Sequence, residues 1–195
     1  MTTNKQQIEW EDFYQSGKTG WDRGRTSGNL NYWIEKDLLK PCRILVPGCG
    51  NGYEVITLVQ KGFDVTAIDI APSAISNLQE ALDKADLRAA LVLGDFFSWQ
   101  PSQKFDVIYE QTSLCALPPN EWDKYENQLY QWLKPKGTIF AQFMQTGQKG
   151  GPPYHCALND MINLFSKEKW DWSSEYIANE MDSGKMELLY LLNKR

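Results

Sequence analysis

The sequence predicts an α/β protein built on a mostly parallel β-sheet. From residue 43 onward, short apolar runs alternate with stretches of helical periodicity, which is the pattern of a sheet covered by helices. A glycine-rich turn, Gly48 to Gly52, follows the first apolar run, and Asp69 closes the next one. Ligands bind beyond the carboxyl ends of parallel strands, so both features indicate a ligand site at that edge.

The individual elements follow from apolar patterning and from proline and glycine positions. Strands are expected at 43–46, 64–68, 88–93, 105–109 and 138–143, each with an apolar and often β-branched centre. Helices are expected at 53–61, 72–84 and 120–133, with Pro72 and Pro119 near helix starts. After the loop at 150–153, a helix at 157–165 precedes an antiparallel hairpin of strands 175–181 and 186–193 at the sheet edge.

Length and composition favour a single domain. The 195 residues have 42% hydrophobic and 23% charged residues, a globular balance that argues against disorder. The first forty residues are too few to bury a core. We therefore predict one domain over 1–195, with residues 1–40 as a cap and 41–195 as the core.

Charge and cysteine content narrow the range of partners. The net charge of -5 argues against a nucleic-acid partner, and no apolar run reaches the ~20 residues of a membrane helix. The polar start, MTTNKQQIEWEDF, does not resemble a signal peptide. The four cysteines are widely spaced and His155 is the only histidine, so we expect reduced thiols, no metal site and a cytoplasmic location.

The spacing of the glycine turn favours a nucleoside ligand other than a dinucleotide. Gly48, Gly50 and Gly52 alternate as GxGxG, which lets the backbone take positive φ and approach a ligand closely. A dinucleotide fold expects a further glycine at position 53, where Tyr53 stands. A tight structural turn is the alternative explanation of the glycines.

Polar residues follow three further strands at the same edge. Asp69 lies 21 residues after Gly48, where a carboxylate can accept hydrogen bonds from ribose hydroxyls. Asp95 and Phe96 follow the third strand and suit the amino group and ring face of adenine. Glu110 and Gln111 follow the fourth. The structural alternatives are a helix cap for Asp69, a turn aspartate for Asp95, and a polar strand end for Glu110 and Gln111.

Several motifs together resemble class I S-adenosylmethionine-dependent methyltransferases. They are VPGCGNGYE at 46–54, TAIDIAPSAI at 66–75, GDFF at 94–97 and LKPKG at 133–137. Within that class, WEDFYQSGKTGWDRGR at 10–25 and GGPPY at 150–154 resemble the thiopurine S-methyltransferase superfamily, which includes plant-type thiol, thiocyanate and halide methyltransferases. The resemblance implies a Rossmann-like, seven-stranded, mostly parallel sheet with one antiparallel edge strand, helices on both faces and an N-terminal helical cap.

The resemblance also implies a cofactor, S-adenosylmethionine, which becomes S-adenosylhomocysteine. It places the rings of the N-terminal cap over the cofactor, although core packing is the alternative for these rings. Plant-type members carry tryptophan at the position of Tyr14 and tend to have tyrosine at that of Gln111. The expected cofactor-binding residues are Trp10, Tyr14, Trp21, Gly48, Gly50, Gly52, Asp69, Ile70, Asp95, Phe96, Glu110 and Gln111.

The expected reaction is methyl transfer to a small soft nucleophile, most simply a thiol or thiolate. Such a nucleophile needs little help from a base, so no catalytic residue is assigned beyond Tyr154 and His155 as candidates. These two and Arg23 are the expected substrate-binding residues, although a lone histidine often only packs and exposed basic residues are often only solvated. Trp122 stands where many relatives have arginine, so no role of that arginine transfers.

Three alternatives stay open at this point. The first is an enzyme of the same fold that transfers the methyl group to halide, thiocyanate or an oxidised metalloid. An NAD(P)-dependent oxidoreductase also needs a glycine turn and a ribose carboxylate, and a non-catalytic module could bind S-adenosylmethionine without turnover. In each case we expect a small-molecule partner and a monomer.

Overall fold

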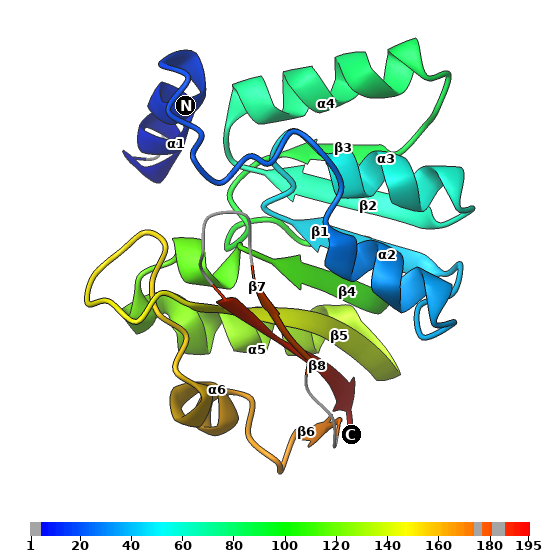
Figure 1. The fold of residues 1–195 in the computed structure, drawn as a ribbon. Helices are drawn as coiled ribbons and strands as arrows, with labels where there is room; N and C mark the ends of the chain where they lie inside the picture. Colours follow the sequence, from blue (N-terminus) through cyan, green and yellow to red (C-terminus); the bar gives the residue numbers. More distant parts are fainter. Residues whose placement is uncertain (1–4, 174–176, 181–185) are drawn as a thin grey trace. The chain divides into compact units, whose positions relative to one another are not determined.

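The computed structural model describes residues 5–173, 177–180 and 186–195. It divides the chain into two compact units, Met1–Gln100 and Pro101–Arg195. Each unit combines strands with covering helices (Figure 1). We describe the two units in turn.

The first unit contains a parallel three-stranded sheet in the order β3-β2-β1. Pro47 of β1 pairs with Ile68 of β2, and Asp69 of β2 pairs with Leu93 of β3, so the three strands end at one edge. The elements are α1 (Lys5–Gln15), α2 (Gly28–Glu35), β1 (Arg43–Pro47), α3 (Tyr53–Gln60), β2 (Asp64–Asp69), α4 (Pro72–Lys84) and β3 (Ala90–Leu93).

Local sequence explains where the helices of this unit begin. Pro72 occupies the first turn of α4, where its missing N–H costs no hydrogen bond. The helix then buries Ala74, Leu78 and Leu82, which share one face at helical spacing. α3 begins directly after the glycine turn. The short βα connections therefore fix the turn and Asp69 at the carboxyl edge of the sheet.

The second unit has the strand order β4-β5-β8-β6, with β7 also paired to β8. β4 and β5 are parallel, whereas β8 runs antiparallel to β5, β6 and β7. The elements are β4 (Phe105–Gln111), the 3-10 helices η1 (Leu114–Ala116) and η2 (Pro119–Glu121), α5 (Trp122–Trp132), β5 (Leu133–Gln145), α6 (Leu158–Leu164), β6 (Trp170–Trp172), β7 (Ile177–Glu180) and β8 (Met186–Lys194).

Polar contacts tie the end of the chain to α5. The Trp170 indole donates to Oε1 of buried Glu126 at 2.6 Å, and Lys169 Nζ donates to its Oε2 at 2.9 Å. Lys194 Nζ lies 3.9 Å from the ring centroid of Tyr130 and donates to the carbonyls of Tyr130 and Leu133. These contacts satisfy the buried carboxylate and hold β8 against the neighbouring helix.

The predicted α/β class is confirmed, with local differences. β5 extends well beyond the predicted 138–143 at both ends, and β3 is shorter than 88–93. Among the described residues there are eight strands where seven were expected, because three-residue β6 adds to the edge. The hairpin of β7 and β8 is confirmed, although residues 175, 176 and 181 of the predicted strand lie outside the described residues. The single domain with a cap over 1–40 stays a prediction.

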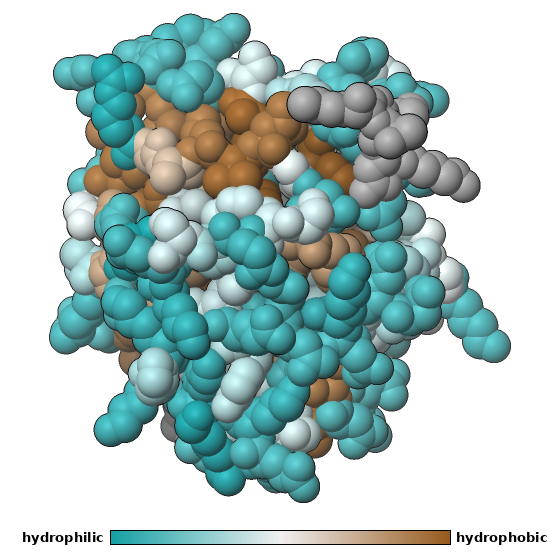
Figure 2. Space-filling model, turned by 180° about the vertical axis from the view of Figure 1, so that it is seen from behind, coloured by the Kyte–Doolittle hydropathy of each residue, from teal (hydrophilic) through white to brown (hydrophobic). Residues whose placement is uncertain are grey.

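One face of the molecule carries a gathering of hydrophobic residues, seen in the upper part of Figure 2, while most of that face is hydrophilic. Within the first unit, β3 is the edge strand, and Leu93 at its end is 50% exposed. Isolated exposed hydrophobic residues are normal on soluble domains.

Among the described residues, no helix has both the length and the apolar character needed to cross a membrane.

Candidate cofactor site in the first unit and residues of the second

The glycine turn has left-handed backbone at all three predicted positions. Gly48, Gly50 and Gly52 have φ values of 57°, 54° and 73°. Other residues adopt this region only at a cost of about 1–2 kcal/mol each. The alternation of glycine along the turn is therefore required by the backbone itself.

The second and third glycines of the turn face different neighbours. A Cβ on Gly52 would lie 2.3 Å from Cδ1 of Leu78 in α4, so this glycine permits close packing of the helix. A Cβ on Gly50 would lie 3.1 Å from the hydroxyl oxygen of Tyr14 in α1. Of these two glycines, Gly50 is the one that faces α1.

Asp69 connects the turn to the start of α4. Its Oδ2 accepts a hydrogen bond from Gly50 N at 2.9 Å, and its Oδ1 accepts one from Ala71 N at 2.9 Å. Burial raises the pKa of this carboxyl, while backbone N–H groups, including that of Ile70, partly oppose the rise. A carboxylate oxygen can accept more than one hydrogen bond, so both oxygens retain capacity for ribose hydroxyls.

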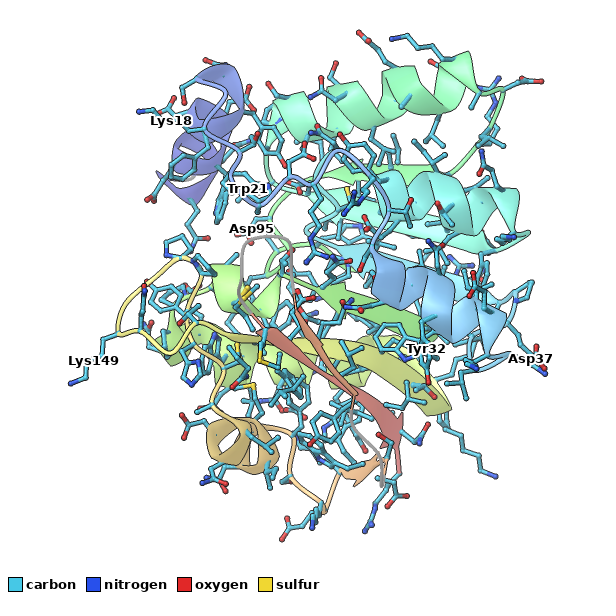
Figure 3. All side chains as sticks on the ribbon, viewed as in Figure 1. Lys18, Trp21, Tyr32, Asp37, Asp95 and Lys149 are labelled. Atoms are coloured by element: carbon cyan, nitrogen blue, oxygen red, sulfur yellow. The ribbon has the colours of Figure 1, made fainter. Side chains whose placement is uncertain are left out.

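Asp95 and Phe96 lie just beyond β3 at the same edge. Asp95 Oδ1 accepts a hydrogen bond from Phe97 N at 2.9 Å, which forms the turn that the structural alternative predicted. The rings of Phe96 and Phe97 meet edge to face, with centroids 5.7 Å apart. Figure 3 shows Asp95 and Trp21 at one end of the first unit.

Four aromatic rings form a cluster in the cap, which we call the cap rings: Trp10, Phe13, Tyr14 and Trp21. Trp21 is the centre, with ring centroids at 5.2 Å from Trp10, 5.7 Å from Phe13 and 5.8 Å from Tyr14, all nearly edge to face. Burial and the nearby Asp69 raise the pKa of Tyr14 well above its ordinary value. Phe13 was missed from the sequence, although its spacing from Trp10 places both on one helix face.

The first unit fits the expected cofactor. The half-buried Asp69 would hold the ribose, the glycine turn gives close access to backbone, and the cap rings offer faces to a sulfonium. Gly50 donates to Asp69, and a Cβ on Gly50 would point at the Tyr14 hydroxyl. These observations bring together eight of the expected residues, Trp10, Tyr14, Trp21, Gly48, Gly50, Gly52, Asp69 and Ile70, in one connected set.

The second unit places the Glu110 side chain inside its core. Glu110 is 1% exposed, and its Oε1 accepts a hydrogen bond from Leu114 N at 2.7 Å. Burial, together with Glu187 nearby, raises the pKa of Glu110 to about 7. This side chain supports the segment after β4 and is not displayed at the surface as a cofactor contact.

Gln111 is oriented by its neighbour on the same strand face. The buried Tyr109 hydroxyl donates to Gln111 Oε1 at 2.8 Å, which turns the amide N–H groups away from Tyr109. The next residue, Thr112, has a φ of 60°, which is unusual for a β-branched side chain and is typical of functional sites. Tyr109 was not singled out from the sequence.

Tyr154 and His155 lie in the loop between β5 and α6, from which Lys149 projects outward in Figure 3. Tyr154 N donates to the Cys115 carbonyl at 2.7 Å, which anchors the loop to η1. His155 Nδ1 accepts a hydrogen bond from Gly147 N at 3.3 Å. Because Nδ1 accepts, the neutral ring carries its hydrogen on Nε2, which can donate a hydrogen bond to a substrate.

Arg23 is half-buried beside Glu54. Burial raises the pKa of Glu54, and the positive charge of Arg23 partly opposes that rise. Glu54 Oε1 in turn accepts a hydrogen bond from Ser27 N. Arg23 thus faces the first turn of α3. Within the described ranges, no group of three or more His, Cys, Asp or Glu residues is arranged to hold a metal ion.

Comparisons with known proteins identify the family of this chain. The thiopurine S-methyltransferase (TPMT) family profile matches residues 5–186. Thiocyanate methyltransferase 1 of Brassica oleracea is 31% identical over 153 residues, covering 77% of this chain and 68% of that enzyme. Thiopurine S-methyltransferase of Legionella pneumophila (strain Corby) is 27% identical over 170 residues, covering 77% of this chain and 76% of that enzyme.

A solved structure shows the same fold at lower identity. The 1,6-didemethyltoxoflavin-N1-methyltransferase of Burkholderia thailandensis, solved with S-adenosylhomocysteine, has a TM-score of 0.78 and 15% identity. The similarity covers 96% of this chain and 86% of that one. The family match favours a methyltransferase over the oxidoreductase and the non-catalytic alternatives. The chain belongs to the thiopurine S-methyltransferase family and is an S-adenosylmethionine-dependent methyltransferase.

Proposed function

We propose that this methyltransferase methylates the sulfur of a small thiol. The relatives it resembles are named for sulfur acceptors, thiocyanate in one case and thiopurines in another. The observation that carries the cofactor half of the proposal is the position of Gly50 between the Asp69 carboxylate and the Tyr14 hydroxyl. The acceptor half rests on the family.

The residues of this chain would bind and orient the cofactor. When bound, S-adenosylmethionine supplies a methyl group on a positively charged sulfur, which a thiolate accepts in one displacement. Asp69 would hold the ribose hydroxyls, and Asp95 with Phe96 would contact the adenine. The cap rings would face the sulfonium, an attraction of about 0.5–2 kcal/mol per contact.

The acceptor would arrive partly ionised. Thiols have a pKa near 8.5 in water, and aromatic thiols have lower values, so part of the acceptor is already a thiolate at neutral pH. His155 is proposed to contact the acceptor by donating a hydrogen bond from Nε2, since Nδ1 accepts from Gly147. Tyr154 and Arg23 are proposed to contact the acceptor.

A panel of acceptors tests this proposal. The protein is incubated with S-adenosylmethionine and, separately, an aliphatic thiol, an aromatic thiol, a thiopurine, bisulfide, thiocyanate and iodide. We expect methyl thioethers from the thiols at the highest kcat/KM. Methyl iodide or methyl thiocyanate as the preferred headspace product would instead favour the second candidate, which the Brassica relative supports.

We further propose a monomeric protein of the cytoplasm with a small-molecule partner and no nucleic-acid partner. The net charge of -5 and the four free cysteines, three of them buried, support this setting. Sedimentation of the purified protein tests the oligomeric state directly.

A further inference from the structure

The N-terminus of α4 is capped by a residue from α1. The N-cap position of α4 is Ala71, whose side chain cannot accept a hydrogen bond. Instead, Glu11 Oε2 accepts from Ser73 N at 2.9 Å, and Glu11 Oε1 accepts from Ser73 Oγ at 2.5 Å. Burial opposes the ionisation of Glu11, but hydrogen bonds from Ser73 and Gln15 outweigh it and lower its pKa. A carboxylate is thus placed where the helix dipole favours negative charge.

A second carboxylate ties the segment after Trp21 to the glycine turn. Asp22 Oδ2 accepts a short hydrogen bond from Asn51 Nδ2 and a longer one, at 3.5 Å, from the Tyr53 hydroxyl. Asn51 Oδ1 accepts from Asn77 Nδ2 at 2.9 Å, which extends the connection to α4. Tyr53, which fills the position of a dinucleotide-type glycine, therefore contacts the cap.

These two tethers flank the residues that face the turn. Glu11 lies one position after Trp10 and three before Tyr14, and Asp22 directly follows Trp21. No described side chain of α1 is fully buried, since all are half-buried or exposed. The aromatic packing of α1 is therefore incomplete, and the charged hydrogen bonds add a directional contribution to its docking.

We propose that Glu11 and Asp22 are positioning residues for cofactor binding, which hold Tyr14 and Trp21 over Gly50 by tethering the cap to α4 and to the glycine turn. This inference rests on the proposed placement of the cofactor beside Gly50 and Asp69. Loss of either tether would release the cap rings while leaving the turn and Asp69 intact. Neither carboxylate needs to contact the cofactor.

The test compares a graded series at Glu11 with a control on the same helix. Glu11→Ala removes both acceptors, whereas Glu11→Gln keeps one oxygen and loses the charge. We expect the Kd for S-adenosylmethionine to rise about tenfold in Glu11→Ala and less in Glu11→Gln, with kcat at saturation nearly unchanged. Glu9→Gln, an exposed change on α1, should leave the Kd unaltered. Asp22→Asn should resemble Glu11→Gln.

Hydrogen exchange of the ligand-free protein tests the tether between α1 and α4 independently of cofactor binding. Amides of α1 and of the start of α4 should exchange faster in Glu11→Ala and in the milder Ser73→Ala than in the parent protein. Unchanged exchange would overturn the tether, and faster exchange with an unchanged Kd would overturn its positioning role. Failure of the parent protein to bind S-adenosylmethionine would refute the proposed function, whereas the exchange comparison would still decide the tether.

Discussion

The backbone N–H of Gly50 donates a hydrogen bond to Oδ2 of Asp69, which joins the turn after β1 to the end of β2. The glycine supplies both the left-handed conformation and the open space beside Tyr14. The aspartate supplies the charge. Each residue can be changed separately, so the two contributions can be measured apart.

Asp69→Asn should weaken S-adenosylmethionine binding strongly. It removes the charge from the expected hydrogen bonds to ribose and places an amide N–H against the donors of Gly50 or Ala71. Two charge-assisted hydrogen bonds of about 1.5–3 kcal/mol each predict a loss of about 100-fold or more in affinity. Isothermal titration measures the loss. Asp64→Asn, an exposed change at the other end of β2, should bind normally, and equal affinity of both variants with parent would contradict the ribose assignment.

Gly50→Ala should disrupt cofactor binding beyond its cost in stability. Gly50 and Gly62 both have positive φ, so alanine at either position strains the backbone by about 1–2 kcal/mol. The new methyl at Gly50 would meet the Tyr14 hydroxyl at 3.1 Å, whereas at Gly62 nothing lies within 4 Å. Thermal melts should therefore show similar losses, and only Gly50→Ala should raise the Kd. A parallel rise in Gly62→Ala would show that the effect is global.

Glu110→Gln should change the pH dependence of stability. Because burial raises the pKa of Glu110 to about 7, the native state binds this proton more tightly than the unfolded chain does. Its contribution is complete below about pH 4.5 and is lost as pH rises through about 7. Relative to the parent, Glu110→Gln should therefore gain about 2–3 kcal/mol in the free energy of unfolding between pH 5 and 8.

Urea denaturation at several pH values measures this difference. Glu187, Cys115, Cys156 and Tyr125 interact with Glu110 and are present in both proteins, so the comparison isolates the Glu110 proton. Glu168→Gln, an exposed change in the same unit, is the control and should follow the parent at every pH. A pH-independent difference between Glu110→Gln and the parent would contradict the raised pKa.

Tyr109→Phe should act through Gln111. Without the hydroxyl, the Gln111 amide loses the partner that fixes its orientation, at a cost of about 1 kcal/mol. Because Gln111 is an expected cofactor-binding residue, Tyr109→Phe should raise the Kd for S-adenosylmethionine a few-fold, and the double variant with Gln111→Ala should bind no more weakly than Gln111→Ala alone. Additive effects would mean that the two side chains act independently.

Much of the central fold could be predicted because its signals are local. The helix expected at 72–84 is α4 exactly as bounded, since proline marks its start and a regular apolar face fixes its length. The expected helix at 120–133 begins later, because Pro119 to Glu121 form a 3-10 turn first. β6 was missed because three residues carry too little pattern, and only its pairing with β8 defines it.

Only the part of the candidate site that lies in short sequence motifs could be predicted. The glycines and Asp69 are fixed by short-range backbone geometry, so their spacing predicts their roles. The Glu11 contact with Ser73 spans 62 residues, and no periodicity reports such a pair. Likewise, the burial of Glu110 depends on strands and loops of the second unit, so its place near the end of β4 could not reveal which way its side chain points.

The packing of Gly52 against Leu78 means that the glycine motif meets two separate physical requirements, close helix packing and close access of a ligand to the backbone. A substitution at Gly52 would push α4 away from the turn even in a chain that had lost its cofactor. Gly52 would therefore be needed with or without a bound cofactor, and its presence in a distant relative says less about activity than the presence of Asp69 does.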